Sequence, residues 1–386
     1  MDRKKILWLC SWYPGKTEPF NGDFIQRHAK AAALFNDIYV IHVMGDGSGR
    51  ITQTEKDIHK EAGLTEHLVY FKKNSSFFGR VKAHYQWLFL FRQAIRKYMV
   101  ENGKPDLVHV HIPHKAGMLG IWLKKKHKLN YVVTEHWGIY NEVEVLNYSG
   151  RSSRFKNFTR KVFQNASACI SVSNYLAAGV NQLVLPVPFT IIHNVVDTRL
   201  FYYSGKHNST FRFIHVSNMV PLKNAEGILR AYKLLLSKGV SAELWMVGDT
   251  NSAIRDHAAS IGLTGTGLSF FGEIPYTAVA EKMQESHCLV VNSNIENSPC
   301  VIGEALCCGL PVIATNVGGI PELTNETNSI LIPPGNDEAL TKAMEQMVAA
   351  RDTYDSKKIA EDAQGKFSYS VIGKKFDDIY AAAISR

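Results

Sequence analysis

Apolar and polar positions along the chain predict strands and helices in alternation. The short apolar run from Ile6 to Cys10 predicts a buried strand, and the apolar spacing from Gly22 to Phe35 predicts a helix. Ile38 to Val43 predicts a second strand, and the same order continues as far as an amphipathic helix from Tyr369 to Ile384. This alternation predicts an α/β fold with parallel, doubly wound sheets.

The length of the chain favours two such domains. A chain of 386 residues exceeds one average domain. A polar, turn-rich segment at residues 198–210 separates two runs of alternating strands and helices. We therefore expect a Rossmann-like domain over residues 1–200, a second one over residues 201–366, and a final helix over residues 367–386.

The most informative stretch runs from Asn292 to Gly319 and carries Glu296 and Glu304. A loop rich in Asn, Ser and Pro precedes an apolar helical run, which we expect to begin after Pro299 and to end at Gly309. Glu296 then lies in the loop before the helix, and Glu304 lies just over one turn inside the helix.

The start of this helix is a candidate phosphate site. Amides in the first turn of a helix have no partners within the helix and favour an anion. We expect the backbone of four residues to hold the phosphate: Ser298, Pro299, Cys300 and Val301. Glu304 would accept hydrogen bonds from ribose hydroxyls and Glu296 would face a sugar, so the arrangement suits a nucleotide-diphosphate sugar. Two glutamates at this spacing also occur by chance, and the loop, helix and strand around them carry the argument.

The stretch resembles the motif of the retaining glycosyltransferases of family four, which adopt the two-domain GT-B fold. The shared pattern is Glu, seven residues, Glu, then Ala, Gly and a Pro-Val strand: Glu296, Glu304, Ala305, Gly309, Pro311 and Val312. The resemblance implies two Rossmann-like domains that face each other across a cleft. It assigns the acceptor to the first domain and the nucleotide sugar to the second, and it makes the last helix cross back to the first domain.

The resemblance also implies which residues hold the donor. In the family, a Gly-Arg pair and a Lys neutralise the diphosphate. Here Lys223 matches the Lys, whereas Ser217 and Asn218 replace the pair, so that Asn218 offers a hydrogen bond without a charge. The segment that binds the nucleotide base through backbone groups corresponds to Gly272, Glu273 and Ile274.

In the first domain, the loop from Ser11 to Asn21 follows the first strand, and ligands of such folds bind outside strand C-termini. By resemblance, Gly22 approaches the donor phosphate and the acceptor, with Asn21 beside it, although the family's Gly-Gly pair is absent. His136 resembles the family's Thr-x-His-Gly site, with Trp137 inserted before the Gly. We expect His136 to line the site as a catalytic residue, the alternative being a structural His at a strand end. We also expect Glu296 to stabilise positive charge at the anomeric carbon.

Composition excludes several classes of protein. The sequence has no run of about 18 apolar residues, so we expect no transmembrane helix. The apolar part of the start is too short for a signal peptide and lacks a small-residue cleavage site. The six cysteines have neither metal-ligand nor redox spacing, which favours a reducing cytoplasm.

The charge is uneven. Residues 1–200 hold 28 Lys and Arg against 15 Asp and Glu, whereas the remainder holds 16 against 20. Such a basic half suggests an anionic partner. The segment from Phe77 to Arg92 interleaves aromatic and basic residues, as an interfacial membrane anchor does, or as a core-facing helix with a solvated basic face does. No nucleic-acid motif accompanies the charge, so we expect an anionic membrane surface as a partner and no nucleic acid.

These observations predict a retaining glycosyltransferase of the cytoplasm, bound peripherally at the inner face of the membrane. It would move a sugar from a nucleotide-diphosphate sugar to an acceptor hydroxyl of a lipid-linked or cell-surface polysaccharide precursor. No Asp-x-Asp motif is present, Glu142-Val-Glu144 being the nearest, so we expect neither a metal nor another cofactor. The alternatives are a sugar-nucleotide epimerase of the same fold, a hydrolase, and an inactive protein that binds a sugar nucleotide or a membrane.

Overall fold

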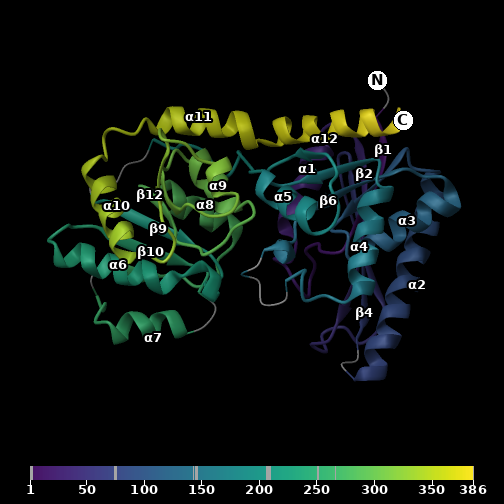
Figure 1. The fold of residues 1–386 in the computed structure, drawn as a ribbon, viewed down its shortest axis with the longest axis horizontal. Helices are drawn as coiled ribbons and strands as arrows, with labels where there is room; N and C mark the ends of the chain where they lie inside the picture. Colours follow the sequence, from purple (N-terminus) through teal and green to yellow (C-terminus); the bar gives the residue numbers. More distant parts are fainter. Residues whose placement is uncertain are drawn as a thin grey trace. The chain divides into compact units, whose positions relative to one another are not determined.

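The structure, a computed structural model, describes residues 3–73, 76–141, 143, 147–205, 210–249, 252–265 and 267–385. Glu142 and Glu144 lie outside the described residues. The chain divides into two compact units (Figure 1). Unit 1 comprises Met1–Val195 with Tyr369–Arg386, and unit 2 comprises Val196–Ser368.

Unit 1 is built on a sheet whose strand order in the described residues is β3-β4-β2-β1-β5-β6-β7-β8. The strands are β1 (Lys5–Cys10), β2 (Asp37–Asp46), β3 (Glu55–Glu61), β4 (Leu64–Lys72), β5 (Leu107–His111), β6 (Tyr131–Glu135), β7 (Ala168–Ser171) and β8 (Phe189–Ile191). All neighbours pair in parallel except β3 and β4, which are antiparallel. Every residue of β5 and β6 is buried, as expected for parallel strands covered on both faces.

Helices cover both faces of this sheet. They are α1 (Asp23–Ala32), α2 (Phe77–Asn102), α3 (Ala116–His127), α4 (Ser153–Asn165), α5 (Asn174–Leu183) and α12 (Tyr369–Ile384), with a 3-10 turn η1 (Gly138–Tyr140). Side chains alternate along a strand. Leu7 and Leu9 of β1 therefore join the core under α2 to α5, whereas Ile6 and Trp8 join the core under α1 and α12.

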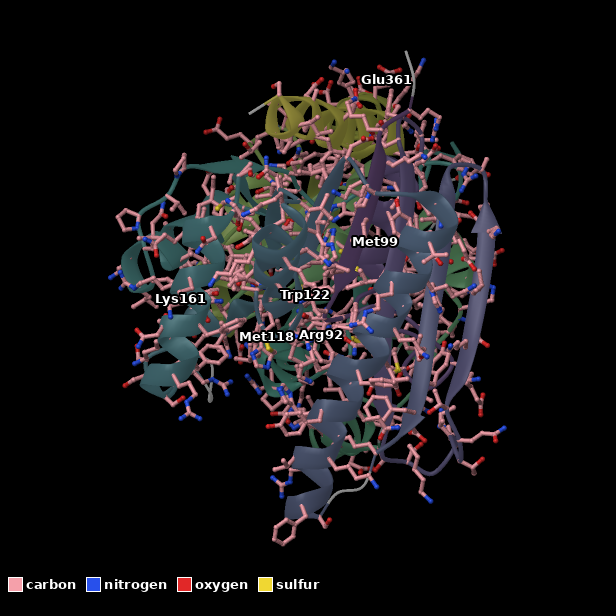
Figure 2. The ribbon with its side chains drawn as sticks, turned by 90° about the vertical axis from the view of Figure 1, so that its right-hand side faces the viewer. Arg92, Met99, Met118, Trp122, Lys161 and Glu361 are labelled. Atoms are coloured by element: carbon pink, nitrogen blue, oxygen red, sulfur yellow. The ribbon has the colours of Figure 1, made fainter. Side chains whose placement is uncertain are left out.

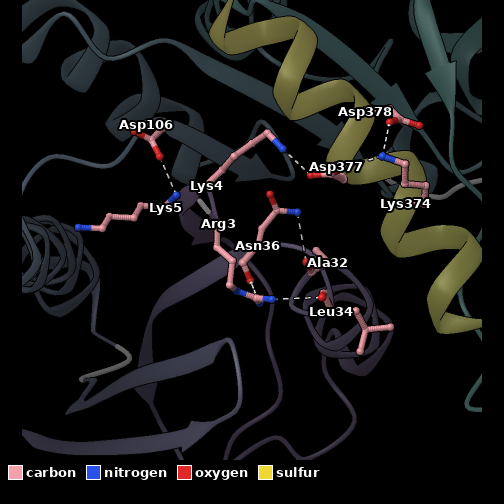
Figure 3. A network of polar contacts seen from close by, with 10 residues as sticks. All are labelled: Arg3, Lys4, Lys5, Ala32, Leu34, Asn36, Asp106, Lys374, Asp377 and Asp378. Atoms are coloured by element: carbon pink, nitrogen blue, oxygen red, sulfur yellow. Dashed lines mark hydrogen bonds and ion pairs between the residues drawn. The ribbon is translucent and has the colours of Figure 1, made fainter. Parts of the chain in front are cut away.

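The C-terminal helix α12 belongs to unit 1 and packs against α1. Its buried residues Phe376 and Tyr380 join the core beneath α1. At its surface, the Lys4 ammonium donates to Asp377 at 2.6 Å, and Lys374 contacts the same carboxylate (Figure 3). The start of β1 and the last helix are thus joined by an ion pair.

Unit 2 is built on a second sheet, whose order in the described residues is β11-β10-β9-β12-β13-β14, parallel throughout. The strands are β9 (Arg212–Val216), β10 (Glu243–Val247), β11 (Leu268–Phe270), β12 (Cys288–Val291), β13 (Val312–Thr315) and β14 (Ser329–Ile332).

Helices again lie on both faces. One core contains α8 (Tyr276–Gln284), α9 (Cys300–Cys307) and α11 (Ser356–Phe367). The other contains α6 (Ala225–Ser237), α7 (Ala253–Ser260) and α10 (Asp337–Ala349). The 3-10 turns η2 (Pro221–Lys223) and η3 (Ile320–Glu322) follow β9 and β13. Both sheets confirm the predicted α/β fold with two doubly wound, Rossmann-like domains.

Apolar periodicity does not identify every strand of this sheet. Glu55–Glu61 forms β3, which pairs with β4 at the edge of the sheet. Its side chains are mostly exposed, so the strand carries no apolar alternation and is defined by backbone pairing alone. Within the described residues, no helix is long and apolar enough to cross a membrane.

Candidate functional site

In unit 2, the order of the strands fixes where a ligand would bind. Counting from β9, the sheet runs 3-2-1-4-5-6, so the direction of winding reverses between β9 and β12. Ligands of open parallel sheets bind at such a switch point, outside the carboxyl ends of the strands. The loops that leave β9 and β12 there are tied together, since Asn294 donates its backbone N–H to the Leu222 carbonyl at 2.8 Å.

These two loops bring together the glutamate that is predicted to be catalytic and the lysine that is predicted to bind phosphate. Lys223 Nζ, at the end of η2, donates to Glu296 Oε1 at 2.5 Å. Ser293 Oγ donates to the same oxygen at 2.7 Å. In the described part of the chain, Glu296 Oε2 has no hydrogen bond and the Lys223 ammonium has no second acceptor. A carboxylate oxygen and ammonium protons thus remain available to a ligand.

The loop after β13 holds the Glu296 backbone in place. Gly319 donates its N–H to the Glu296 carbonyl at 2.9 Å. Gly318 has φ 56°, and a Cβ there would lie 1.9 Å from that carbonyl oxygen. Only glycine therefore fits at residue 318.

Glu304 lies on α9 and is 3% exposed. Tyr276, at the start of α8, donates its hydroxyl to Glu304 Oε1 at 2.7 Å. This bond fixes the carboxylate that we expect to bind ribose. Tyr276 was not among the predicted site residues.

The first turn of α9 is where we expect the anion site. The helix begins at Cys300 with Pro299 as its N-cap and without a side-chain cap. Ser298 and Pro299 are buried, whereas Cys300 and Val301 are half-buried. Since proline has no backbone N–H, Pro299 positions the turn and donates no hydrogen bond to a phosphate.

Asn218 lies on the loop between β9 and η2, and its side chain is exposed. A neighbouring network shapes this loop. His215 Nδ1 donates to the Val290 carbonyl at 2.8 Å, so its Nε2 accepts from Ser217 Oγ at 2.7 Å. Ser217 Oγ in turn accepts the Met219 N–H at 3.0 Å. Burial lowers the pKa of His215 to about 4, which keeps the ring neutral for this role.

The segment predicted to bind the base follows β11. The Gly272 N–H donates to Asp249 Oδ1 and its carbonyl accepts from Gly248, both at 2.7 Å. Both backbone groups of Gly272 thus already have hydrogen-bond partners within the protein. Glu273 is exposed and Ile274 is half-buried, and their binding to a base stays a prediction.

In unit 1, Gly22 caps α1 from the left-handed region, at φ 76°. A Cβ at Gly22 would lie 2.8 Å from the Trp12 carbonyl carbon and 2.9 Å from the Tyr13 nitrogen. Asn21 donates its side-chain amide to Glu18 Oε2 at 2.5 Å. The close packing of Gly22 against the loop after β1 therefore requires glycine at this residue, whether or not a ligand binds beside it.

His136 is only 7% exposed and lies among other histidines rather than on an open surface. Its Nε2 is 3.3 Å from His111 Nδ1, and its ring centroid is 5.7 Å from that of His28. The backbone N–H groups of His136 and Trp137 both donate to Glu135 Oε1 at 2.9 Å. Its catalytic role stays a prediction.

Sequence reasoning missed the residues that orient the predicted ones, namely Ser293, Tyr276 and His215. Ser293 follows β12, Tyr276 begins the helix after β11, and His215 is the last residue but one of β9, so all three lie near the carboxyl edge of the sheet. Position at that edge is the signal that could have found them, because no local motif contains them. Among the described residues, no group of three or more His, Cys, Asp or Glu side chains could hold a metal ion.

A separate cavity of about 530 Å³ lies at the opposite edge of this sheet, beside the residues that precede β9, β12 and β13. It is lined by Phe211, His287, Pro311 and Arg351, among others. Since ligands of parallel sheets bind at the carboxyl edge, we do not assign the donor to it.

Two family models together match most of the chain. The family model described as "Glycosyl transferases group 1" matches residues 200–365. The model described as "Glycosyltransferase Family 4" matches residues 30–200. Together they extend from residue 30 to residue 365.

Individual proteins agree with this assignment. The Bacillus subtilis (strain 168) protein named as the teichuronic acid biosynthesis glycosyltransferase TuaC is 26% identical to this chain over 361 residues, which cover 88% of each chain. Sucrose-phosphate synthase from Thermosynechococcus elongatus superposes with a TM-score of 0.77 at 18% identity, over 99% of this chain and 100% of the other. The structure of Anabaena HepE in complex with UDP superposes with a TM-score of 0.70 at 17% identity, over 98% of this chain and 100% of the other. At these identities the structures show the fold, which is GT-B.

Proposed function

Because the chain is a glycosyltransferase of the GT-B fold, with domains of the group 1 and family 4 types, we propose that it is a retaining enzyme that uses a nucleotide-diphosphate sugar. The observation that carries the proposal is the contact of Lys223 with Glu296 at the switch point of unit 2, beside the start of α9. A relative named for teichuronic acid biosynthesis and a structural neighbour that binds UDP support a polysaccharide acceptor and such a donor.

In the proposed reaction, the bond from the anomeric carbon to the diphosphate breaks while the acceptor oxygen attacks from the same face, and the proton of the acceptor hydroxyl passes to the departing diphosphate oxygen. The Lys223 ammonium, the Asn218 amide and the first-turn amides of α9 stabilise the negative charge that develops on the diphosphate. Glu296 Oε2 accepts from a sugar hydroxyl and stabilises positive charge at the anomeric carbon. Glu304, held by Tyr276, binds the ribose hydroxyls. These residues stabilise the negative charge of the leaving group, so we propose that the reaction needs no metal.

The test compares Glu296→Gln with Lys223→Gln by nucleotide affinity and by release of nucleoside diphosphate, with membrane lipid extract as the acceptor source. Glu296→Gln should lower kcat by roughly 10²-fold or more and leave nucleotide affinity unchanged, since its carboxylate acts on the sugar. Lys223→Gln should weaken nucleotide affinity about tenfold or more and lower kcat as well, since a charge-assisted bond to phosphate is lost.

Lys238→Gln is the matched control, because Lys238 is an exposed, ion-paired lysine of the same unit, 2.7 Å from Glu345. Lys238→Gln should change neither nucleotide affinity nor kcat. Wild-type rates for Glu296→Gln would remove its catalytic role. Conversion of the donor without an acceptor would instead support an epimerase, and intact bound donor without turnover would support a binding protein.

The same proposal places the acceptor at an anionic membrane surface on the inner side. One face of α2 exposes Phe78, Tyr85 and Phe89, which are 83%, 67% and 64% exposed. Helices α2, α3 and α4 carry five, three and four Lys or Arg residues, and Glu101 is their single acidic residue. Figure 2 faces these helices, and the Arg92 guanidinium of α2 lies 5.2 Å from the centre of the Trp122 ring of α3. Aromatic side chains within a basic surface fit an anionic lipid bilayer.

A further inference from the structure

A pocket of unit 1 lies at the edge of the sheet opposite the predicted acceptor residues. It has a volume of about 340 Å³ and lies where the chain enters β6 and β7. It is lined by Ile121, Lys124, Lys125, Lys128, Asn130 and Asn165. His136 follows β6 at its carboxyl end, whereas Lys128 and Asn130 precede the same strand. The pocket is therefore separate from the predicted donor and acceptor residues, and it lies wholly within unit 1.

The side chains that line this pocket carry positive charge and no negative charge. Three of the six residues are lysines, and none is acidic. Within the described residues, the ammonium groups of Lys125 and Lys128 have neither a hydrogen bond nor an ion pair. The pKa of the neighbouring His127 is lowered, first by desolvation and then by the charge of Lys126, so the positive potential extends beyond the pocket. Like charges held together without a carboxylate favour an anion.

Lys124 is held in place without a ligand. It is half-buried, and its ammonium donates to the Asn165 carbonyl of α4 at 2.7 Å. Asn165 is fixed in turn by its side-chain amide, which donates at 2.8 Å to the carbonyl of Lys161, a residue labelled in Figure 2. An ammonium has three N–H donors, and in the described part of the chain Lys124 uses one of them. Because the side chain is already ordered, little conformational entropy is lost when the other two bind a ligand.

Lys128 has a backbone conformation that ordinarily selects glycine. It caps the C-terminus of α3 with φ 56° and ψ 36°, and its N–H donates to the Leu123 carbonyl. Glycine or asparagine is usual at such a position, because other side chains are strained there. Strained residues of this kind cluster at functional sites. The lysine at residue 128 thus supplies a positive charge to the pocket at some cost in stability.

The Asn130 side chain adds a neutral donor. Asn130 is half-buried, and in the part of the chain that the structure describes its side-chain amide has no hydrogen bond. Its backbone carbonyl accepts the Val108 N–H at 3.1 Å, which anchors the residue between β5 and β6. The amide N–H groups of Asn130 are therefore available to a ligand in the pocket.

The helix dipole explains only part of this arrangement. Basic side chains in the last turn of a helix are favoured by the dipole, and this accounts for Lys124 and Lys125. It accounts neither for a lysine in the left-handed conformation at residue 128 nor for the amide of Asn130. A bound anion accounts for all four side chains.

We propose that this pocket binds a phosphate monoester, whose oxygens accept from the ammonium groups of Lys124, Lys125 and Lys128 and from the Asn130 amide. A phosphate monoester fits better than a carboxylate, because it carries about 1.5 to 2 negative charges at neutral pH and three terminal oxygens. The group belongs to a lipid headgroup or to a soluble compound, which offer the same chemistry. The inference does not rest on the proposed sugar transfer, in which none of these four residues takes part.

The experiment measures binding of three probes to the full chain by ligand-detected NMR: glycerol 3-phosphate, glycerate and glycerol. Glycerol 3-phosphate should bind about tenfold more tightly than glycerate, because it makes more charge-assisted hydrogen bonds. Glycerol, which has no charge, should bind more weakly than either. Equal affinities for glycerol 3-phosphate and glycerate, or no binding of either, would overturn the proposal.

The variants Lys125→Gln and Lys128→Gly should each weaken binding of glycerol 3-phosphate about tenfold, since each removes a charge-assisted bond. Lys128→Gly should also leave the thermal midpoint unchanged or raise it, because glycine adopts the left-handed conformation without strain. Lys126→Gln is the matched control, since Lys126 is an exposed lysine in the same turn of α3 but outside the pocket lining. An equal loss of affinity in Lys126→Gln would indicate a diffuse effect of charge and overturn the pocket.

Two further comparisons identify the site and the source of the phosphate. Binding of glycerol 3-phosphate should be unchanged in Lys223→Gln, and a loss there instead of in Lys125→Gln would place the phosphate in the donor site and overturn the proposal. Vesicles of phosphatidylcholine that contain phosphatidic acid are compared with vesicles that contain phosphatidylglycerol at equal surface charge. Stronger binding to phosphatidic acid that is lost in Lys128→Gly supports a lipid headgroup. Equal binding to both vesicles, with glycerol 3-phosphate still preferred over glycerate, supports a soluble phosphate.

Discussion

At the scale of single residues, a group of buried histidines makes unit 1 sensitive to acid. His28, His109, His111 and His136 lie together, with ring centroids between 4.0 and 5.7 Å apart in three of the contacts. Burial lowers the pKa of His28 to about 4, and burial with neighbouring histidines places the pKa values of the other three well below the ordinary range. Burial of Glu135 raises its pKa to about 7, which acts in the opposite sense.

We predict that the thermal midpoint of unit 1 falls as the pH drops from about 6.5 towards 4. The unfolded chain takes up protons at these histidines near pH 6.5, whereas the folded chain does not, so the free energy of unfolding decreases. The loss is up to about 1.4 kcal/mol per pH unit for each histidine, and the single Glu135 offsets only one of the four. Calorimetry at pH 7.5 and pH 5 measures it.

His28→Gln should reduce this pH dependence, because Gln can still donate to the His193 carbonyl that His28 contacts at 3.0 Å but takes up no proton. His59→Gln is the control, since His59 is exposed on β3. A midpoint that does not change between the two pH values would contradict the account of the cluster.

At the scale of elements, α2 buries some of its aromatic residues and exposes others. Residues such as Trp87, Phe91 and Ile95 join the core of unit 1. On the other face, Phe78, Tyr85 and Phe89 are exposed. The interleaved aromatic residues are thus divided between core and surface, and the exposed ones need a partner or remain in water.

We predict that Tyr85→Ser combined with Phe89→Ser lowers binding to anionic vesicles about tenfold or more. Each exposed ring that enters a bilayer contributes roughly 1.5–3 kcal/mol when fully buried. Wild-type binding should weaken as salt is raised, because the basic residues of α2 to α4 attract anionic lipid. Co-sedimentation with vesicles of phosphatidylglycerol and phosphatidylcholine measures both effects.

Leu234→Ser is the control, because Leu234 is 42% exposed on α6 of unit 2, away from the basic helices. It should leave vesicle binding unchanged. Absence of wild-type binding to anionic vesicles at low salt would sink the membrane proposal and leave the sugar-transfer proposal in place.

At the scale of the molecule, the sequence predicted most of the fold and part of the site. Local periodicity predicted the alternation of strands and helices, and the family motif indicated Glu296 and Lys223, which the structure joins at 2.5 Å. Periodicity alone could not predict β3, because its side chains are exposed.

The most direct test of the central claim is a thermal-shift panel of UDP, GDP, ADP and CDP sugars, each with and without a chelator. A ligand that binds only the folded state stabilises it by about 2.7 kcal/mol at a concentration 100 times its Kd. The account predicts a raised midpoint with the sugars of one base, unchanged by chelator and lost in Lys223→Gln. No shift with any sugar nucleotide, or a shift that survives in Lys223→Gln, would contradict it.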